Sequence, residues 1–385
     1  MLNLVKQSLT IISMRFRIQT DIFRKAIEAT SHATSTSNLT PILENILIDA
    51  GYKKVTLTWN NLDMAIEYIV DIGVDVEAEG KYTISSKFLT SYIALIQDAE
   101  VYVTLEKGGS ITFATQSSET KFKWTSPEKF PTIPSIVTGQ AISLNAREFK
   151  TAIEKTLFST ADGSVRPMLA GIYMRSINGE LIFASTDSFR LSEFRIRPET
   201  TVAHNPIIIP EKAANELSRL LTDDVKAIEI CTHESQLLAI VGPIRLTSRL
   251  LAGKFPDYEW FFPSEYRSKS VVLRSEFVNA LKQANLVARQ NNFNTRIRSK
   301  HEGKIEVSTG DTEIGASIVS ISGSVEWQED IIGVNSEYLL QALSVIREDY
   351  ISFEYKNPLS PVVIKWVATG ESKQSYRHLI MPLKI

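Results

Sequence analysis

One short pattern recurs three times along the chain and constrains its fold more than any other feature. In residues 142–157 (ISLNAREFKTAIEKTL), apolar and polar residues first alternate, as in a strand with one buried face, and an amphipathic helix follows. Asn145 can cap this helix, and Glu148 stands three residues later, where it can complete a capping box. The apolar stripe of the helix consists of Phe149, Ala152, Ile153 and Leu157. Such a unit cannot bury its own stripe, so it needs copies or partners.

The same stripe occurs about 125 residues earlier and about 125 residues later. The matching positions are Phe23, Ala26 and Ile27 near the start, and Phe277, Ala280, Leu281 and Ala284 towards the end. A second strand-to-helix unit recurs at the same interval, in residues 84–89, 209–214 and 334–339. A repeat of this length indicates three homologous domains rather than a solenoid. We predict an α+β fold with domains at 14–138, 139–263 and 264–385, each with two helices against antiparallel sheet.

The N-terminal segment, the chain length and the composition limit the class of protein that this chain can be. Residues 1–13 precede the first repeat and carry a short apolar patch without a small-residue cleavage site, so we expect a loose arm or an upstream start assigned in error. A length of 385 residues suits three domains, each large enough for its own core. The single cysteine, Cys231, suits a reducing cytosol, and no apolar run approaches the roughly 20 residues of a membrane span. We therefore expect a cytoplasmic protein without a membrane segment.

The sequence shows no strong catalytic or metal-binding pattern. It lacks a glycine-rich phosphate loop, and its five histidines are too scattered to form a zinc motif with the single cysteine. Asp187 beside Arg190 could orient an anionic substrate in a hydrolase, which is the rival function from the enzyme class. A turn carboxylate paired with a nearby arginine is the commoner arrangement, and no nucleophile with a base accompanies it. We expect no catalysis, no cofactor and no bound metal.

The predicted helices carry basic residues on the sides that face away from their apolar stripes. The net charge of −2 gives no general attraction for nucleic acid, so only a segregated patch could bind it. Lysine and arginine often merely solvate a helix surface, which is the alternative interpretation. Their recurrence on equivalent helices favours a surface that follows DNA phosphates without reading bases. The predicted DNA-facing residues are Arg24, Lys25, Lys150, Lys155, Lys212, Arg219, Lys282 and Arg289.

Four short segments stand in a specific order and spacing: RPMLAG at 166–171, ASTDSFRL at 184–191, LAGKFPDY at 251–258 and MPL at 381–383. Together with the three repeats, they resemble the bacterial sliding clamps, the family of DNA polymerase III β subunits. The resemblance covers residues 14–385. It implies a head-to-tail homodimer that closes a six-domain ring around duplex DNA.

The same resemblance implies protein partners for the ring. They are an ATP-driven clamp loader, the catalytic subunit of DNA polymerase III and other proteins that carry a clamp-binding motif. Such a ring acts by enclosure, so no residue needs to perform chemistry. A clamp-like adaptor that binds partners without encircling DNA is the alternative function.

For the contact between subunits, the resemblance implies two aromatic residues on one side and a helix end on the other. Phe122 and Trp124, on an edge strand at 121–125, would meet Val287 and Ala288 of the second subunit. The alternative for the two aromatic residues is the core of their own domain.

The resemblance also implies a pocket for the Leu and Phe side chains of a partner peptide. Four positions depart from the family pattern: Ser188 replaces a glycine, Phe189 a histidine, Trp260 an arginine, and Ser37 an arginine that touches DNA. For any single pocket residue, ordinary core is the alternative. The implied pocket residues are Leu169, Thr186, Ser188, Phe189, Arg190, Leu191, Pro256, Trp260, Phe261, Phe293, Asn335, Tyr338, Leu359, Pro361, Leu379, Ile380, Met381, Pro382 and Leu383.

Overall fold

The computed structural model describes most of the chain, as two compact units. The described residues are 12–31, 40–106, 110–133, 136, 141–163, 165–199, 204–300, 303–327, 330–367, 370 and 372–385. Ser37 and residues 1–11 of the expected arm lie outside them. The first unit comprises Met1–Ser143 with Leu220–Arg249, and the second comprises Leu144–Arg219 with Leu250–Ile385. The domain boundaries at 138 and 263 remain a prediction.

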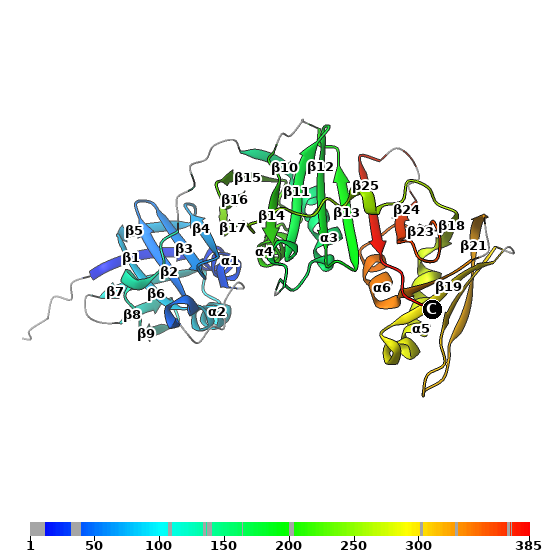
Figure 1. The fold of residues 1–385 in the computed structure, drawn as a ribbon. Helices are drawn as coiled ribbons and strands as arrows, with labels where there is room; N and C mark the ends of the chain where they lie inside the picture. Colours follow the sequence, from blue (N-terminus) through cyan, green and yellow to red (C-terminus); the bar gives the residue numbers. More distant parts are fainter. Residues whose placement is uncertain are drawn as a thin grey trace, which may run out of the picture. The chain divides into compact units, whose positions relative to one another are not determined.

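Within its described residues, the first unit contains two α-helices and two antiparallel sheets (Figure 1). Its helices are α1 (Thr20–Ser31) and α2 (Ser86–Leu95). One sheet has the order β5-β1-β7-β8-β9, from Val74–Ala78, Ile12–Gln19, Glu100–Glu106, Ile111–Ala114 and Glu119–Phe122. The other has the order β10-β15-β16-β17-β4-β3-β2-β6, from Ile142–Asn145, Ala227–His233, Gln236–Val241, Ile244–Arg249, Met64–Val70, Lys54–Asn60, Asn45–Gly51 and Gly80–Ser85.

The described part of the second unit is built on one sheet of twelve strands with four α-helices (Figure 1). The helices are α3 (Ala146–Thr156), α4 (Glu211–Leu220), α5 (Arg274–Ala288) and α6 (Ser336–Ser344). The first half of the sheet has the order β14-β11-β12-β13-β25-β24, from Ile207–Pro210, Gly171–Ile177, Glu180–Thr186, Arg190–Ile196, Gln374–Ile380 and Val362–Trp366. The second half continues as β23-β18-β21-β20-β19-β22, from Tyr350–Tyr355, Ser268–Leu273, Ile318–Trp327, Lys304–Thr309, Asn294–Lys300 and Asp330–Asn335.

The predicted strand-to-helix repeats are confirmed. Each stripe helix follows directly on a short strand, in the pairs β1–α1, β10–α3 and β18–α5, and the second unit of each repeat gives β6–α2, β14–α4 and β22–α6. The Asn145 side chain caps α3 by accepting a hydrogen bond from the Glu148 amide at 3.1 Å. Asn335 caps α6 in the same way, from the amides of Glu337 and Tyr338 at 2.9 and 3.1 Å. These caps satisfy amide groups that the first turn of a helix leaves without partners.

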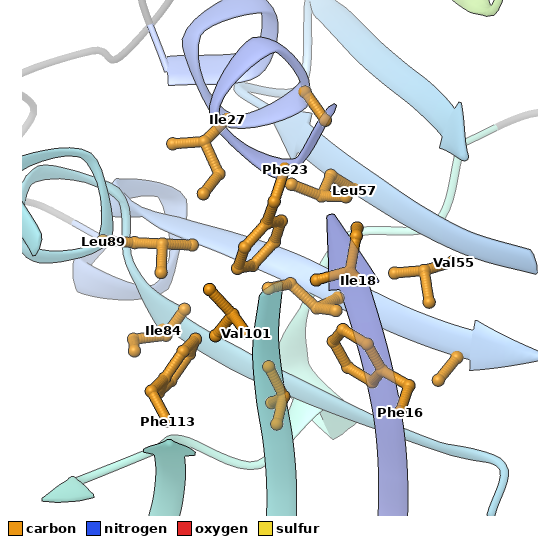
Figure 2. Close-up of a cluster of buried hydrophobic side chains, with 14 of the residues drawn as sticks. Phe16, Ile18, Phe23, Ile27, Val55, Leu57, Ile84, Leu89, Val101 and Phe113 are labelled. Carbon is orange, nitrogen blue, oxygen red and sulfur yellow. The ribbon is translucent and has the colours of Figure 1, made fainter. Parts of the chain in front are cut away.

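The stripe residues form the cores, as their periodicity predicts. Figure 2 shows the core of the first unit, where Phe23 and Ile27 of α1 point towards side chains from β1, β3 and α2. The Phe23 ring lies 6.4 Å from the rings of both Phe16 and Phe113, measured between centroids. Phe149 of α3 and Phe277 of α5 are buried in the same manner. Burying such an aromatic side chain stabilises the fold by about 1.5–3 kcal/mol.

Two predicted boundaries are wrong. Strand β1 begins at Ile12, inside the segment that the sequence assigned to a loose arm. The edge strand predicted at 121–125 is β9, which spans Glu119–Phe122 and ends before Trp124. Thr125 instead forms an isolated bridge with Thr83, donating and accepting backbone hydrogen bonds of 3.0 and 3.1 Å. Pro127 follows and starts a short 3₁₀ turn, which explains why the strand stops here.

Candidate protein-binding pocket

A largely apolar pocket of about 260 Å³ opens on the second unit. It is formed where the ends of β12, β13 and β25 meet two short 3₁₀ helices, Pro167–Leu169 and Glu259–Phe261. The residues that line it are Arg166, Leu169, Thr186, Ser188, Phe189, Arg190, Leu191, Pro256, Tyr258, Phe261, Leu379 and Met381. Ten of these twelve belong to the set that the sequence predicted.

The turn between β12 and β13 shapes one side of the pocket. The Asp187 carboxylate accepts hydrogen bonds from the amides of Phe189 and Arg190, at 2.9 and 3.0 Å. Ser188 adopts a left-handed backbone conformation (φ 81°), where glycine is usual. This turn leaves the Phe189 side chain 63% exposed at the pocket. The Phe189 carbonyl accepts a hydrogen bond from the Met381 amide at 2.9 Å, which fixes the chain after β25 along the opposite side.

Arg190 lies almost fully buried in the pocket wall and binds three separate elements. Its Nε pairs with Asp187 at 2.9 Å, its Nη2 donates to the Phe158 carbonyl at 2.7 Å, and its Nη1 donates to the Gln341 side chain. The guanidinium also lies 4.4 Å from the centre of the Tyr338 ring, a cation–π contact. Arg190 and Asp187 are therefore engaged in holding local structure, which supports the structural interpretation of this pair over a substrate-binding one.

The structure does not bring all the predicted pocket residues to this cavity. Phe293, Asn335, Tyr338, Leu359, Pro361, Ile380, Pro382, Leu383 and Trp260 are absent from its lining. Ile380 has no exposed surface because it pairs within the sheet, and Asn335 is engaged in capping α6. Tyr338 does not line the cavity itself but contacts the lining residue Arg190. Trp260 stacks on Phe261, with 3.8 Å between ring centroids, and is 70% exposed.

Sequence reasoning missed two lining residues, Arg166 and Tyr258. Each stands inside a segment that the resemblance used, at the start of RPMLAG and the end of LAGKFPDY. The Arg166 guanidinium donates to the Ser188 hydroxyl at 3.1 Å, so the serine that departs from the family pattern provides its hydrogen-bond acceptor.

The predicted DNA-facing residues differ in exposure. Lys25, Lys212, Lys282 and Arg289 are exposed, whereas Arg24, Lys150 and Arg219 are partly buried. Arg24 donates to the Ile96 carbonyl at 2.9 Å and pairs with Asp21, and Arg219 pairs with Glu216 at 2.8 Å. The exposed basic residues remain candidates for contact with phosphates.

The expectation that Lys155 faces solvent is wrong. Its side chain is buried, Nζ donates to the Val345 carbonyl, and the ammonium lies 5.0 Å and 5.6 Å from the rings of Trp366 and Tyr376. Burial lowers the pKa of Lys155. Lys155 stands three residues after the buried Ala152, at the edge of the apolar stripe, and this position was the available signal.

The residues predicted for the contact between subunits also differ in their exposure. Phe122 packs against the rings of Tyr92 and Phe113, at 5.0 and 5.3 Å between centroids, and Trp124 packs partly buried on the same core. Ala288 has no exposed surface, so it cannot contribute to a surface contact, and that assignment is wrong. Its neighbour Leu286 is 68% exposed on α5, and Val287 is partly buried. The sequence signal for Leu286 was an apolar residue outside the apolar stripe of its helix, near the helix end.

Next to the lining residue Leu379, strand β25 carries a buried histidine. His378 on β25 has no exposed surface, and its Nδ1 lies 2.8 Å from the Ser192 hydroxyl, which in turn lies 2.8 Å from Ser159. Burial, together with the positive charge of Arg190, lowers the pKa of His378 to about 3. Among the described residues, no group of three His, Cys, Asp or Glu side chains could hold a metal ion. No helix in the described part of the chain is long and apolar enough to cross a bilayer.

Comparisons with known proteins cover nearly the whole chain. Three family models match in order: the N-terminal domain of the DNA polymerase III beta subunit at residues 14–134, its central domain at 143–257 and its C-terminal domain at 260–384. The chain is 28% identical to a beta sliding clamp of Staphylococcus aureus (strain N315) and 29% identical to one of Staphylococcus epidermidis. Both alignments cover 378 residues, 96% of this chain and 99% of the relative.

Solved clamp structures have the same fold. The DNA polymerase sliding clamp from Bacillus subtilis superposes with a TM-score of 0.91 at 26% identity, over 97% of this chain and 100% of that one. The sliding clamp from Pseudomonas aeruginosa bound to griselimycin gives a TM-score of 0.90 at 21% identity, with the same coverage.

His378 generates a prediction about acid stability. Its pKa is lower in the folded chain than its ordinary value of 6.5, so the unfolded chain binds the extra proton first as the pH falls. Folding should therefore lose up to about 1.4 kcal/mol per pH unit below pH 6.5 from this residue alone. His378→Asn, which can keep a bond to Ser192, should unfold in urea with a shallower loss of stability between pH 6.5 and 4.5. Equal slopes for the two proteins would show that His378 does not titrate in this way.

Proposed function

Because the chain belongs to the DNA polymerase III beta subunit family, we propose that it is a DNA sliding clamp. Two copies join head to tail, close a ring around duplex DNA and tether the replicative polymerase. The observation that carries this proposal is the match of all three family domains, in order, across residues 14–384. The partners that follow are duplex DNA, a second copy of the chain, the catalytic subunit of DNA polymerase III, an ATP-driven loader and other clamp-motif proteins.

The mechanism is topological. A closed ring holds DNA because the duplex cannot leave sideways, so the ring needs no strong attraction for phosphates. The exposed side chains of Lys25, Lys212, Lys282 and Arg289 contribute weak contacts that allow sliding. No step of this mechanism requires a nucleophile, a base, a metal or a cofactor. The ring acts in the cytoplasm, where its DNA lies. We keep the predicted domain boundaries at 138 and 263 for this ring, with all of β1, from Ile12, in the first domain.

The pocket near Phe189 is the proposed docking site for partners. Its walls of Leu169, Leu191, Leu379 and Met381 suit the Leu and Phe side chains of a peptide tail. The Arg166 guanidinium at the same cavity has donors beyond the one bound to Ser188 and can bind peptide carbonyl or carboxylate oxygens. Phe189 and Phe261 line the cavity, and Trp260 stacks on Phe261 outside the lining. These rings favour peptides with an aromatic anchor.

The decisive experiment compares two DNA substrates that differ only in topology. Clamp loaded onto nicked circular DNA should stay bound at salt concentrations where direct contacts are screened. When the same DNA is cut once to make it linear, the clamp should slide off the ends during an incubation of equal length. The measurement is clamp that co-elutes with DNA in gel filtration. Equal retention on circles and linear DNA would favour the adaptor that does not encircle DNA.

The ring contact can be tested at Leu286. We place this exposed leucine and Val287 in the contact with Phe122 and Trp124 of the second subunit. Leu286→Asp should weaken the dimer by about a hundredfold, because an unpaired charge in an apolar contact costs about 3 kcal/mol or more. Sedimentation equilibrium measures the change. Val165→Asp, at an apolar residue that is 86% exposed, is the control and should remain dimeric. A dimeric Leu286→Asp variant would remove this residue from the contact.

The pocket can be tested at Met381, which lines it and is 38% exposed. Met381→Asp should lower the affinity for a fluorescein-labelled polymerase-tail peptide by about a hundredfold, since it puts a charge against an apolar side chain. Ile72→Asp is the matched control, because Ile72 is 77% exposed, is absent from the cavity lining and belongs to none of the predicted site residues. Fluorescence anisotropy gives both affinities. The pocket assignment fails if Met381→Asp binds like the parent.

A further inference from the structure

A continuous chain of hydrogen bonds leaves the pocket wall and runs into helices α6 and α5. It begins at Arg190, whose Nη1 donates to the Gln341 side-chain oxygen. The Gln341 amide nitrogen donates to one Glu337 oxygen at 3.3 Å, and Asn285 of α5 donates to the other at 3.2 Å. Ser336 completes the chain by donating to the Asn285 oxygen at 2.7 Å. Neither Gln341 nor Glu337 lines the pocket.

Gln341, Glu337 and Asn285 each form hydrogen bonds through both polar atoms of the side chain, which fixes their orientation. The Gln341 amide can place its oxygen towards Arg190 only while its nitrogen faces Glu337. The two Glu337 oxygens accept from two different helices, so α5 and α6 together determine where that carboxylate lies. Because Arg190 is 8% exposed, its guanidinium depends on protein groups rather than on water for hydrogen bonds.

Arg190 forms part of the pocket wall and bonds to another lining residue. Its backbone carbonyl accepts from the Thr186 hydroxyl, which also lines the cavity, at 2.6 Å. Its guanidinium lies 4.4 Å from the centre of the Tyr338 ring of α6. Without Gln341, the guanidinium keeps its bonds to Asp187 and to the Phe158 carbonyl but loses its hydrogen bond to α6. It can then shift towards the cavity and take up space that an apolar anchor needs.

We propose that Gln341 and Glu337 are positioning residues for the peptide pocket. They hold Arg190 against α6 and so keep the pocket open in its peptide-binding shape, although they touch neither the cavity nor the peptide. The inference rests on the proposed function of that pocket and extends it to residues outside the family's pocket set.

Substitutions at Gln341 and Glu337 separate positioning from simple packing. Gln341→Ala removes both hydrogen bonds of Gln341. Gln341→Glu keeps an oxygen acceptor for Arg190 but loses the donor to Glu337 and places two carboxylates against each other. The double variant Gln341→Glu with Glu337→Gln restores this hydrogen bond with donor and acceptor exchanged. Gln283→Ala, at an exposed glutamine of α5, is the matched control. The probe is a fluorescein-labelled peptide with a Leu-Phe pair from the polymerase tail, followed by anisotropy, with sedimentation and circular dichroism to confirm intact dimers.

Gln341→Ala should weaken peptide binding about tenfold, equivalent to about 1.4 kcal/mol. Gln341→Glu alone should bind as weakly as Gln341→Ala, because it has lost the bond to Glu337. The double variant Gln341→Glu with Glu337→Gln should recover most of the affinity, and Gln283→Ala should match the parent. Unchanged binding by Gln341→Ala, or a double variant as weak as Gln341→Glu alone, overturns the proposal while leaving the pocket in place. If the parent itself does not bind the peptide, the proposed pocket function fails and this inference with it.

Discussion

Antiparallel pairing between β13 and β25 is the constraint on which the second unit depends. The pairing runs from Arg190 opposite Ile380 to Ile196 opposite Gln374, and it joins strands that lie far apart in sequence. One strand belongs to the segment matched by the central-domain model and the other to the segment matched by the C-terminal model. This register places Leu191 directly opposite Leu379, and both residues line the pocket. A slip of one residue would exchange the two faces and abolish the pocket.

Charged groups secure the same strand pair where it is most buried. Glu193 of β13 is 1% exposed, yet its carboxylate is bound by Arg195 at 2.7 Å, Arg377 at 2.6 Å and the Tyr258 hydroxyl at 2.8 Å. Burial opposes ionisation of Glu193, but the two guanidinium groups outweigh it and lower its pKa. Tyr258 lines the pocket, so this network ties the segment after residue 250 to both strands. A buried charge is tolerable here because every partner is present.

The sequence predicted well what depends on periodicity and poorly what depends on neighbours in space. Phe23, Phe149 and Phe277 could be placed in cores because helical spacing alone puts them there. Lys155 could not, because only the folded chain brings Trp366 and Tyr376 to its ammonium. Most lining residues of the pocket were found through the resemblance, since no local pattern connects Leu169 with Leu379. Ala288 failed because a residue near a helix end can still face the interior.

The continuous sheet has a mechanical consequence. Antiparallel strands in register resist sliding, because all their cross-strand bonds must break together before a new register can form. The β13–β25 pairing should therefore keep its register under a bending force. The second unit should behave as one rigid body. Elastic strain imposed on a subunit would then be stored in softer connections outside the sheet, such as the loops that enter and leave it. The pocket, being built into the stiff element, would keep its shape while the subunit flexes.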